Sequence, residues 1–260
     1  MARQFIINTD YLALDKQVEA LPSSFDEGGA LLYAGRNVIK RFVWRDDKGI
    51  DRTVVVKRYA RMHWFQKLCY STFFASKAKR AYLYAFKFIE HGIDTPAPIA
   101  YLEAKKHHIL QRCYLVTEEC CWPDCTFLRH NPEAVASERG ESLLQSLAAF
   151  IVKLHTEGIL HGDLNLSNIL YRQESDGEWR FAVIDINRSH FDQNPSQSQC
   201  LDNLVRLTHD RELLSSLISR YASLRDWSPK ECTDYVLRRL NAFERRRELR
   251  HKLFRRKKSD

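Results

Sequence analysis

Long apolar runs are absent from this chain of 260 residues. A helix needs roughly 18 uninterrupted apolar residues to cross a bilayer, and no stretch approaches that length. The apolar run within residues 1–10 is also too short for a secretory signal. Seven cysteines make an odd number without the regular spacing of a disulfide framework. We therefore expect a cytoplasmic protein rather than a membrane-spanning or secreted one.

Glycine and proline are also scarce, at 9 and 7 residues, in a composition that is otherwise that of an ordinary globular protein. The length allows one or two domains with a full core. Acidic residues are missing from residues 57–88, where every charged side chain is basic. The net charge of +8 favours anionic partners such as a nucleotide, a phosphorylated lipid, a membrane surface or nucleic acid.

A polar motif lies between apolar segments in the second half of the chain. Residues 161–170 read H-G-D-L-N-L-S-N-I-L, so Asp163 and Asn168 are five positions apart in a loop. Asp185 follows Asn168 by seventeen residues and closes a strand-like run. Residues 175–177 predict a turn between two short strands, and this hairpin is expected to bring Asn168 and Asp185 to adjacent strand ends.

The order of these residues resembles the catalytic loop and metal-binding aspartate of the protein-kinase-like phosphotransferases. The resemblance implies that Asp163 accepts the proton of the attacking hydroxyl, while Asn168 and Asp185 hold Mg2+ against the phosphates of ATP. Asp and Asn also fill turns through local hydrogen bonds, which is the alternative interpretation. That alternative does not explain the ordered set of loop, hairpin signal and second aspartate.

The residues ahead of the motif predict a small antiparallel sheet. Strands are indicated over residues 30–33, 37–44, 53–59, 99–103 and 109–117 by β-branched and aromatic content. Lys57, in the third strand, resembles the kinase lysine that grips the ATP phosphates; a solvated lysine at a strand end is the alternative. Residues up to about 17 show no clear period and predict an irregular arm.

Two parts of the kinase pattern are missing. No G-x-G-x-x-G lies between the first two strands, where only Gly28, Gly29 and Gly35 are available. The helix predicted over residues 76–91 has no glutamate where a kinase pairs one with its lysine, because Glu90 lies near the helix end. The sequence therefore does not specify a partner for Lys57.

The fifth strand leads to Glu118 and Cys120, at the place of the hinge whose backbone binds adenine in a kinase. The resemblance therefore implies nucleotide contacts at these two residues in addition to Lys57. Cys120, Cys121 and Cys125 lack the two spaced pairs of a zinc site, so we expect free cysteines near the hinge.

The remainder of the chain predicts helices. They are expected from Asn131 through an apolar stripe that ends at Gly158, over residues 201–207 and 211–221, and from Pro229 onward. The segment after Asp185 is short and polar and contains no A-P-E. This favours a small-molecule or lipid-headgroup kinase over a regulated protein kinase.

Within the superfamily, the chain resembles the lipopolysaccharide core kinases, the Kdo/heptose kinase family, over about residues 30–210. The similarity is carried by the loop motif, by V-I-D-I-N-R at 183–188, by V-K-R-Y at 56–59 and by G-I-D-T-P-A-P-I-A at 92–100. Aminoglycoside and choline phosphotransferases and RIO kinases share a very similar loop. The resemblance implies phosphorylation of a sugar hydroxyl in the lipopolysaccharide inner core, on the cytoplasmic face of the inner membrane.

Two basic segments favour an anionic membrane surface as a partner. Residues 61–74 mix cations with aromatic rings, and residues 245–258 form a basic tail. Such mixtures suit the headgroup layer, whereas packing of the rings in the small lobe and a solvated basic end are the alternatives. We expect a lipopolysaccharide precursor or another sugar as substrate and no nucleic acid, and nothing in the sequence specifies an oligomeric state.

Taken together, the sequence predicts an α+β protein with a two-lobed protein-kinase-like fold. Residues 1–118 are expected to form an N-terminal lobe with the sheet, and residues 119–260 a mainly helical C-terminal lobe. The predicted function is a kinase that uses ATP and Mg2+ to phosphorylate Kdo or heptose. A RIO-like atypical protein kinase, an aminoglycoside-type phosphotransferase and a pseudokinase binding module are the alternatives.

Overall fold

A computed structural model describes residues 2–60, 75–107 and 109–256, in two compact units. The sheet unit comprises Met1–Cys121 together with Val183–Arg188, and the helical unit comprises Trp122–Ala182 with Ser189–Asp260. The sequence prediction placed one boundary, after residue 118. In the structure, the chain first passes from the sheet unit to the helical unit after Cys121, and the short segment that contains Asp185 belongs to the sheet unit.

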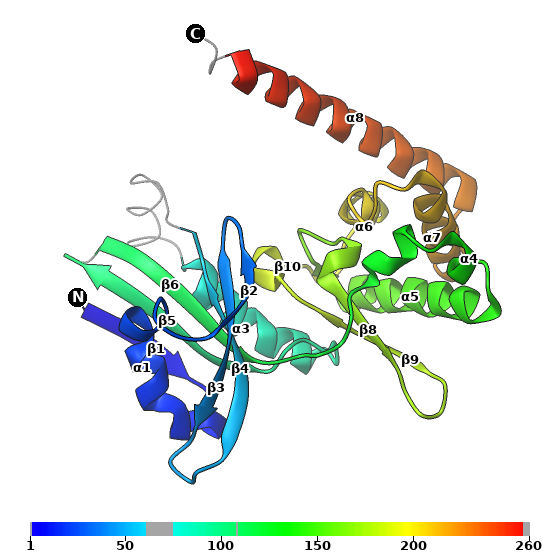
Figure 1. Ribbon diagram of the computed structural model, residues 1–260. Coiled ribbons are helices and arrows are strands. Elements are labelled where there is room, and N and C mark those ends of the chain that lie inside the picture. Colours follow the sequence, from blue (N-terminus) through cyan, green and yellow to red (C-terminus); the bar gives the residue numbers. More distant parts are fainter. Residues whose placement is uncertain (1, 61–74, 108, 257–260) are drawn as a thin grey trace. The chain divides into compact units, whose positions relative to one another are not determined.

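The sheet unit is built on one antiparallel sheet with the strand order β1-β5-β6-β4-β3-β2 (Figure 1). Its elements are β1 (Ala2–Ile7), η1 (Thr9–Leu14), α1 (Asp15–Ser24), β2 (Ala30–Ala34), β3 (Val38–Arg45), β4 (Asp51–Arg58), α3 (Lys77–Glu90), β5 (Pro98–Lys106), β6 (Ile109–Glu118) and η4 (Ile186–Arg188). The five predicted strands are therefore all present.

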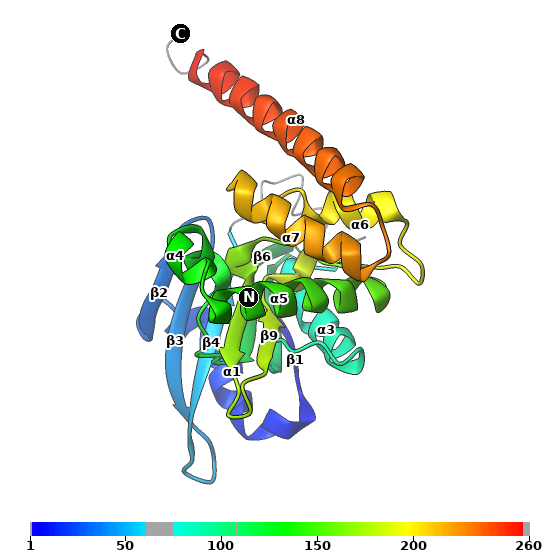
Figure 2. The same ribbon diagram turned by 90° about the vertical axis from the view of Figure 1, so that its right-hand side faces the viewer.

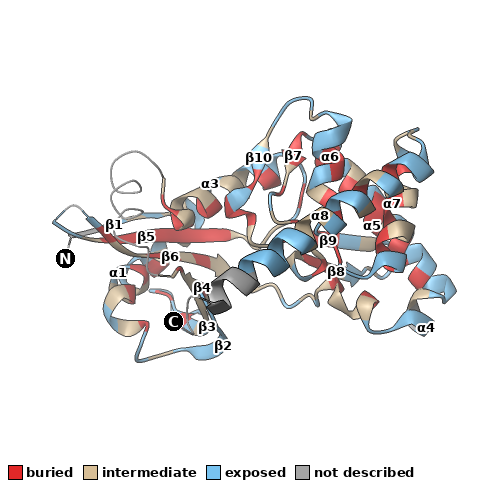
Figure 3. Cartoon of the chain, turned by 90° about the horizontal axis from the view of Figure 1, so that it is seen from above, coloured by how far each residue is buried: buried red, intermediate tan, exposed pale blue. Residues whose placement is uncertain are grey.

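A helix covers each face of the sheet. Strand residues alternate between the two faces, so neighbouring residues of one strand pack against different helices. Leu102 and Tyr114 belong to a core cluster with Leu21 of α1, whereas Tyr101 belongs to a second cluster with Tyr82 of α3. Burial on both faces explains why β5 is buried over nearly its whole length (Figure 3).

The first residues do not form the predicted irregular arm. β1 pairs with β5 and adds an edge strand to the sheet, and α1 buries Val18 and Leu21. The sequence signal is weak because α1 is only ten residues long and contains Pro22. β1 depends on pairing with residues about a hundred positions away, which a local pattern cannot show.

The helical unit contains four longer helices and two short strand pairs (Figure 2). Its elements are η2 (Cys125–Arg129), α4 (Pro132–Val135), α5 (Glu138–Thr156), β7 (Ile159–Leu160), η3 (Leu166–Asn168), β8 (Ile169–Gln173), β9 (Trp179–Val183, whose last residue belongs to the sheet unit), β10 (His190–Phe191), α6 (Gln197–Leu204), α7 (Arg211–Leu224) and α8 (Pro229–Arg256). The predicted hairpin is the β8–β9 pair.

Local signals explain most of the helix boundaries. The predicted start at Asn131 belongs to the short α4, whereas the long helix α5 begins after Ser137, whose side chain caps the N–H of Gly140. α5 ends before Gly158, which has a φ of +71°. A Cβ at this position would overlap the carbonyl oxygen of Asp192, so only glycine fits.

The last helix, α8, is buried only along its first half. Cys232, Val236 and Leu240 form a buried stripe at helical spacing where α8 packs on α6 and α7. Residues 245–250 are all exposed (Figure 3). Within the described ranges, none of the helices has both the length and the apolarity that a membrane span requires. The mixed α+β class predicted from the sequence is confirmed.

Candidate active site

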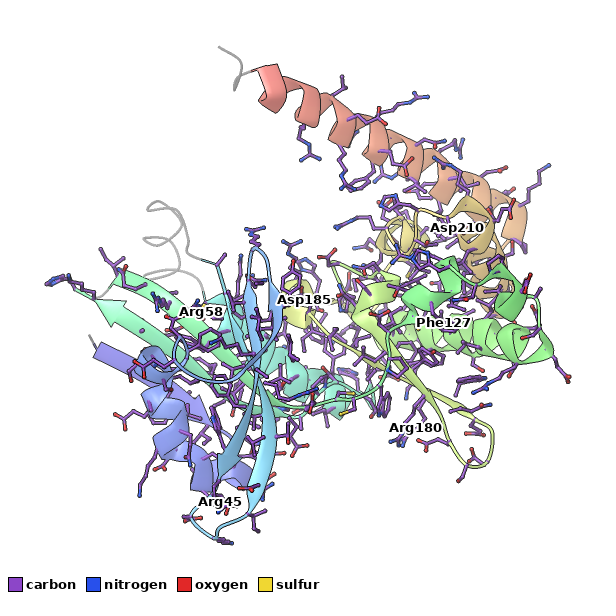
Figure 4. The ribbon with its side chains drawn as sticks, in the orientation of Figure 1. Arg45, Arg58, Phe127, Arg180, Asp185 and Asp210 are labelled. Carbon is purple, nitrogen blue, oxygen red and sulfur yellow. The ribbon has the colours of Figure 1, made fainter. Side chains whose placement is uncertain are left out.

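The sheet unit brings together two of the predicted site residues, Lys57 and Asp185. Lys57 lies on β4, and its Nζ is 2.8 Å from Oδ1 of Asp185, which is labelled in Figure 4. The lysine side chain is only 15% exposed. The carboxylate also accepts a 2.7 Å hydrogen bond from Nδ2 of the buried Asn187. A lysine at a fully solvated strand end, the alternative interpretation, does not describe this environment.

The backbone around Asp185 is fixed within the sheet unit. The N–H of Val183 donates to the carbonyl oxygen of Asp94, and Oγ1 of Thr95 donates to the carbonyl oxygen of Val183. Asp185 itself has a φ of +59°, in the left-handed region that residues other than glycine rarely adopt. Such a conformation costs on the order of 1 kcal/mol and concentrates at functional sites.

Asp185 takes the place of the missing helix glutamate as the partner of Lys57. α3 carries a single acid, Glu90, which is its last residue and is exposed. Among the described residues, Asp185 is the only carboxylate within ion-pair distance of Lys57, and the ring of Tyr59 lies 5.3 Å from the ammonium group. The lysine is therefore oriented by the predicted metal-binding aspartate itself.

Positive charge gathers at the start of α3. α3 packs on η4, which ends at Arg188. Burial lowers the pKa of Lys77, and the nearby charges of Arg36 and Arg188 lower it further. Arg36 lies in the β2–β3 turn, and Oδ1 of the next residue, Asn37, accepts from the N–H of Ala60. The sequence has no glycine-rich motif between its first two predicted strands. The turn between β2 and β3 carries Arg36 at this place.

Sequence reasoning did not name Arg36, Lys77 or Arg188 as site residues. For Lys77 the available signal was the absence of acids from residues 57–88, whereas Arg36 and Arg188 lie outside that stretch. A stretch rich in basic residues attracts polyanions such as phosphate chains.

The helical unit holds the predicted catalytic residue Asp163 and the predicted metal ligand Asn168 in the loop between β7 and β8. Gly162 has a φ of +71°, which turns the chain directly before Asp163. The side-chain amides of Asn165 and Asn168 both donate to the carbonyl oxygen of Asp163, at 3.0 and 2.9 Å. The bond of Asn168 uses Nδ2 as the donor, so the amide oxygen Oδ1 of that side chain takes no part in it.

The end of α6 and the segment after it hold this loop at three points. Oδ1 of Asn203 accepts from the N–H of His161, and the carbonyl oxygen of Leu207 accepts from the N–H of Leu166. Nη2 of Arg206 lies 2.7 Å from Oδ1 of Asp163. Sequence reasoning missed Asn203 and Arg206, because nothing in their spacing marks residues about forty positions beyond the motif.

His155 supports the same segment from the core. Its imidazole is 1% exposed and lies 2.7 Å from Oη of Tyr221 and 3.2 Å from Oδ1 of Asn203. Burial lowers the pKa of His155 to about 4, so the ring is neutral at pH 7. The histidine is therefore a structural residue whose neutral form supports Asn203.

The predicted hinge residues Glu118 and Cys120 lie at the end of the first stretch of the sheet unit. The N–H of Glu118 donates to the carbonyl oxygen of Ala97. Its carboxylate accepts a hydrogen bond from the hydroxyl of Tyr11. Burial raises the pKa of the Tyr11 phenol, and the nearby carboxylate raises it further. The nucleotide contacts of Glu118 and Cys120 stay a prediction, as do the roles assigned to Asp163, Asn168, Asp185 and Lys57.

A small antiparallel sheet with an internal Lys–Asp pair, combined with a helical unit that carries an Asp–Asn loop, is the plan of the protein-kinase-like phosphotransferases. The sequence model of the family described as "Lipopolysaccharide kinase (Kdo/WaaP) family" matches residues 33–233 of this chain. The chain belongs to this family, as the sequence motifs predicted.

The fold is shared with a solved structure described as "WaaP in complex with acyl carrier protein". The similarity has a TM-score of 0.61 at 17% identity and covers 92% of this chain and 98% of that chain. The predicted kinase-like fold is thereby confirmed. A search of curated proteins finds no match to the chain.

Proposed function

We propose that this protein transfers the terminal phosphoryl group of ATP to a hydroxyl of Kdo or heptose in the lipopolysaccharide inner core. Family membership establishes a lipopolysaccharide kinase, and the proposal adds the donor and the acceptor sugar. The observation that carries it is the Lys57–Asp185 pair, in which a buried-strand lysine meets an aspartate held in a left-handed conformation. This pairing prepares a site for a metal–phosphate group.

The motif residues then have separate tasks. Asp163 accepts the proton of the sugar hydroxyl. Lys57 binds phosphate oxygens of ATP, which either replace Asp185 as its partner or bind beside it. Asp185 and Asn168 supply the hard oxygen donors that Mg2+ prefers, and the orientation of the Asn168 amide fits this role because its nitrogen is already bonded. When bound, Mg2+ neutralises the charge that develops on the phosphates.

Two features favour a sugar over a peptide as acceptor. Only η4, β10 and a short turn separate Asp185 from α6, which begins at Gln197. This leaves no long segment of the kind on which protein kinases bind their peptide. The cations at the start of α3 (Lys77) and in the β2–β3 turn (Arg36) instead suit a strongly anionic phosphate donor and an anionic acceptor substrate.

We also propose peripheral attachment to the cytoplasmic face of the inner membrane. Residues 245–250 of α8 are exposed and include Arg245, Arg246, Arg247 and Arg250. Each basic residue near an anionic bilayer contributes on the order of 1 kcal/mol. The second predicted membrane segment, residues 61–74, lies outside the described residues.

The test is phosphoryl transfer from ATP to isolated core oligosaccharides that contain either Kdo or heptose, with Mg2+ and with EDTA. We expect metal-dependent transfer to one of these sugars, with the phosphate located by NMR of the product. Transfer only to protein would favour the RIO-like alternative. ATP binding without metal-dependent turnover on any acceptor would favour the pseudokinase alternative.

A further inference from the structure

Arg206 makes a charged contact to the candidate base. Its Nη2 lies 2.7 Å from Oδ1 of Asp163, while the guanidinium carbon lies 5.4 Å from the ring centre of Phe243 on α8. The guanidinium therefore lies near both a carboxylate and an aromatic ring. An arginine stacked on a ring loses less freedom when it pairs with a carboxylate, because its plane is already fixed.

α8 also fixes the chain on both sides of Arg206. Before it, Arg239 binds both carboxylate oxygens of Asp202 at 2.8 Å. After it, Glu244 binds His209 at 2.9 Å and Arg211 at 2.7 Å. The helix thus holds the segment of residues 202–211 at its two ends and contacts its middle through Phe243.

The same segment holds the loop that carries Asp163. Asn203 accepts from the N–H of His161, and Leu207 accepts from the N–H of Leu166. These two bonds fix the backbone on either side of Asp163, and Arg206 fixes its side chain. A continuous set of contacts therefore runs from α8 through residues 202–211 to the candidate base.

From these contacts we infer that Arg206 is a positioning residue for the phosphoryl transfer, held by Phe243 of α8. Arg206 binds Oδ1 of Asp163 and directs Oδ2 of that carboxylate to the acceptor hydroxyl. During transfer, the hydroxyl proton moves to Asp163 as the new O–P bond forms and the bond to the leaving ADP breaks. This inference rests on the proposed function for its chemistry, but not for the contacts themselves.

The chain offers a matched control. Arg172 lies 4.5 Å from the ring centre of Trp122 and 2.6 Å from the carboxylate of Glu174. Its side chain is 44% exposed and that of Arg206 is 43% exposed. Arg172 therefore has the same kinds of partner and the same exposure, but its carboxylate is not in the catalytic loop.

The kinetic experiment compares Arg206→Gln, Arg206→Lys, Phe243→Ala and Arg172→Gln by steady-state transfer to the core sugar. We expect Arg206→Gln to lower kcat by about 10- to 100-fold, as for other residues that orient a base, with KM for ATP and sugar within about threefold. Arg206→Lys should recover part of the loss, and Arg172→Gln should behave as wild type. Phe243→Ala should lower kcat less, and should add nothing when combined with Arg206→Gln.

A second experiment needs no activity. Amide hydrogen exchange of the peptide that covers residues 159–168 should be faster in Arg206→Gln and Phe243→Ala, but unchanged in Arg172→Gln. If the wild type transfers phosphate to no sugar but this exchange pattern holds, the proposed function fails and the positioning contact stands. The inference is overturned if Arg206→Gln keeps kcat within twofold, if its defect is confined to KM for the sugar, or if exchange in the loop is unchanged.

Discussion

The two aspartates predicted from the motif are each paired with a cation at nearly the same distance, but in different surroundings. Asp185 is 2.8 Å from Lys57, which is 15% exposed on an inner strand of the sheet. Asp163 is 2.7 Å from Arg206, which is 43% exposed beside α8. Solvent weakens a charge pair much more at an exposed site. The exposed partner differs between the two pairs, because the side chain of Asp185 is 33% exposed and that of Asp163 is 18% exposed. Solvent therefore reaches the carboxylate of the Lys57–Asp185 pair and the cation of the Arg206–Asp163 pair.

The strongest way to test this comparison is to remove the charge of Asp163. Asp163→Asn should retain ATP binding but lower kcat by about two to four orders of magnitude, because the acceptor proton loses its base. Steady-state kinetics and ATP titration calorimetry would measure both quantities. Asp176→Asn, in the exposed β8–β9 turn, is the control. Near-normal turnover in Asp163→Asn would show that the base is misassigned.

Breaking the other pair should act on nucleotide binding as well as on turnover. Lys57→Met should lower kcat/KM for ATP by about 10- to 1000-fold, and Asp185→Asn should weaken Mg-ATP binding itself. Glu90→Gln is the control, because Glu90 is exposed and the carboxylate that pairs with Lys57 is that of Asp185. A large defect in Glu90→Gln, measured by the same ATP titrations, would mean that Lys57 has a different partner in the working enzyme.

The support beneath the Asp163 loop should respond to pH through His155. Its pKa is about 4 when folded and about 6.5 when unfolded, so the unfolded chain binds the extra proton between these values. The free energy of unfolding should therefore fall as the pH drops below 6.5, by about 2 kcal/mol at pH 5. Urea unfolding at pH 7 and pH 5 measures the loss, which should be smaller in His155→Gln. Equal losses in both proteins would remove His155 as the cause.

The smallest effect concerns the outer half of α8. A chain that ends at Glu248 keeps Phe243 and Glu244 but loses six basic residues. It should sediment less with anionic vesicles at low salt, and the difference should shrink at high salt because screening weakens the attraction. Its kcat on a soluble sugar should equal that of the full chain. A full-length chain with these six residues changed to glutamine is the control. Unchanged sedimentation would leave Arg245–Arg247 and residues 61–74 as the remaining membrane candidates.

Features set by neighbouring residues were predictable from the sequence. The helix predicted over residues 76–91 is α3 (Lys77–Glu90), because Ser76 caps its first turn and Gly92 follows its end with a φ of +65°. The strand that carries Lys57 and the β8–β9 hairpin were likewise placed by local composition and turn residues. The family followed from motifs whose spacing is fixed by the same local geometry.

Features that depend on distant contacts were not predictable. β1 was missed because it is ordered only by pairing with β5. The partner of Lys57 was left open because Asp185 lies 128 positions further along the chain. Arg206 has no sequence mark at all, since its importance comes from where the segment after α6 meets the loop.

The assignment of Val183–Arg188 to the sheet unit has a consequence for how this protein can be divided. The chain passes between the two units three times, after residues 121, 182 and 188. A cut after Cys121 would yield a first fragment that contains Lys57 but lacks Asp185. Neither unit is thus encoded by one uninterrupted stretch of the gene. Recombination could therefore not exchange a unit as a single piece of DNA. A version of the enzyme split into its two units would have to supply the six-residue segment as a separate peptide.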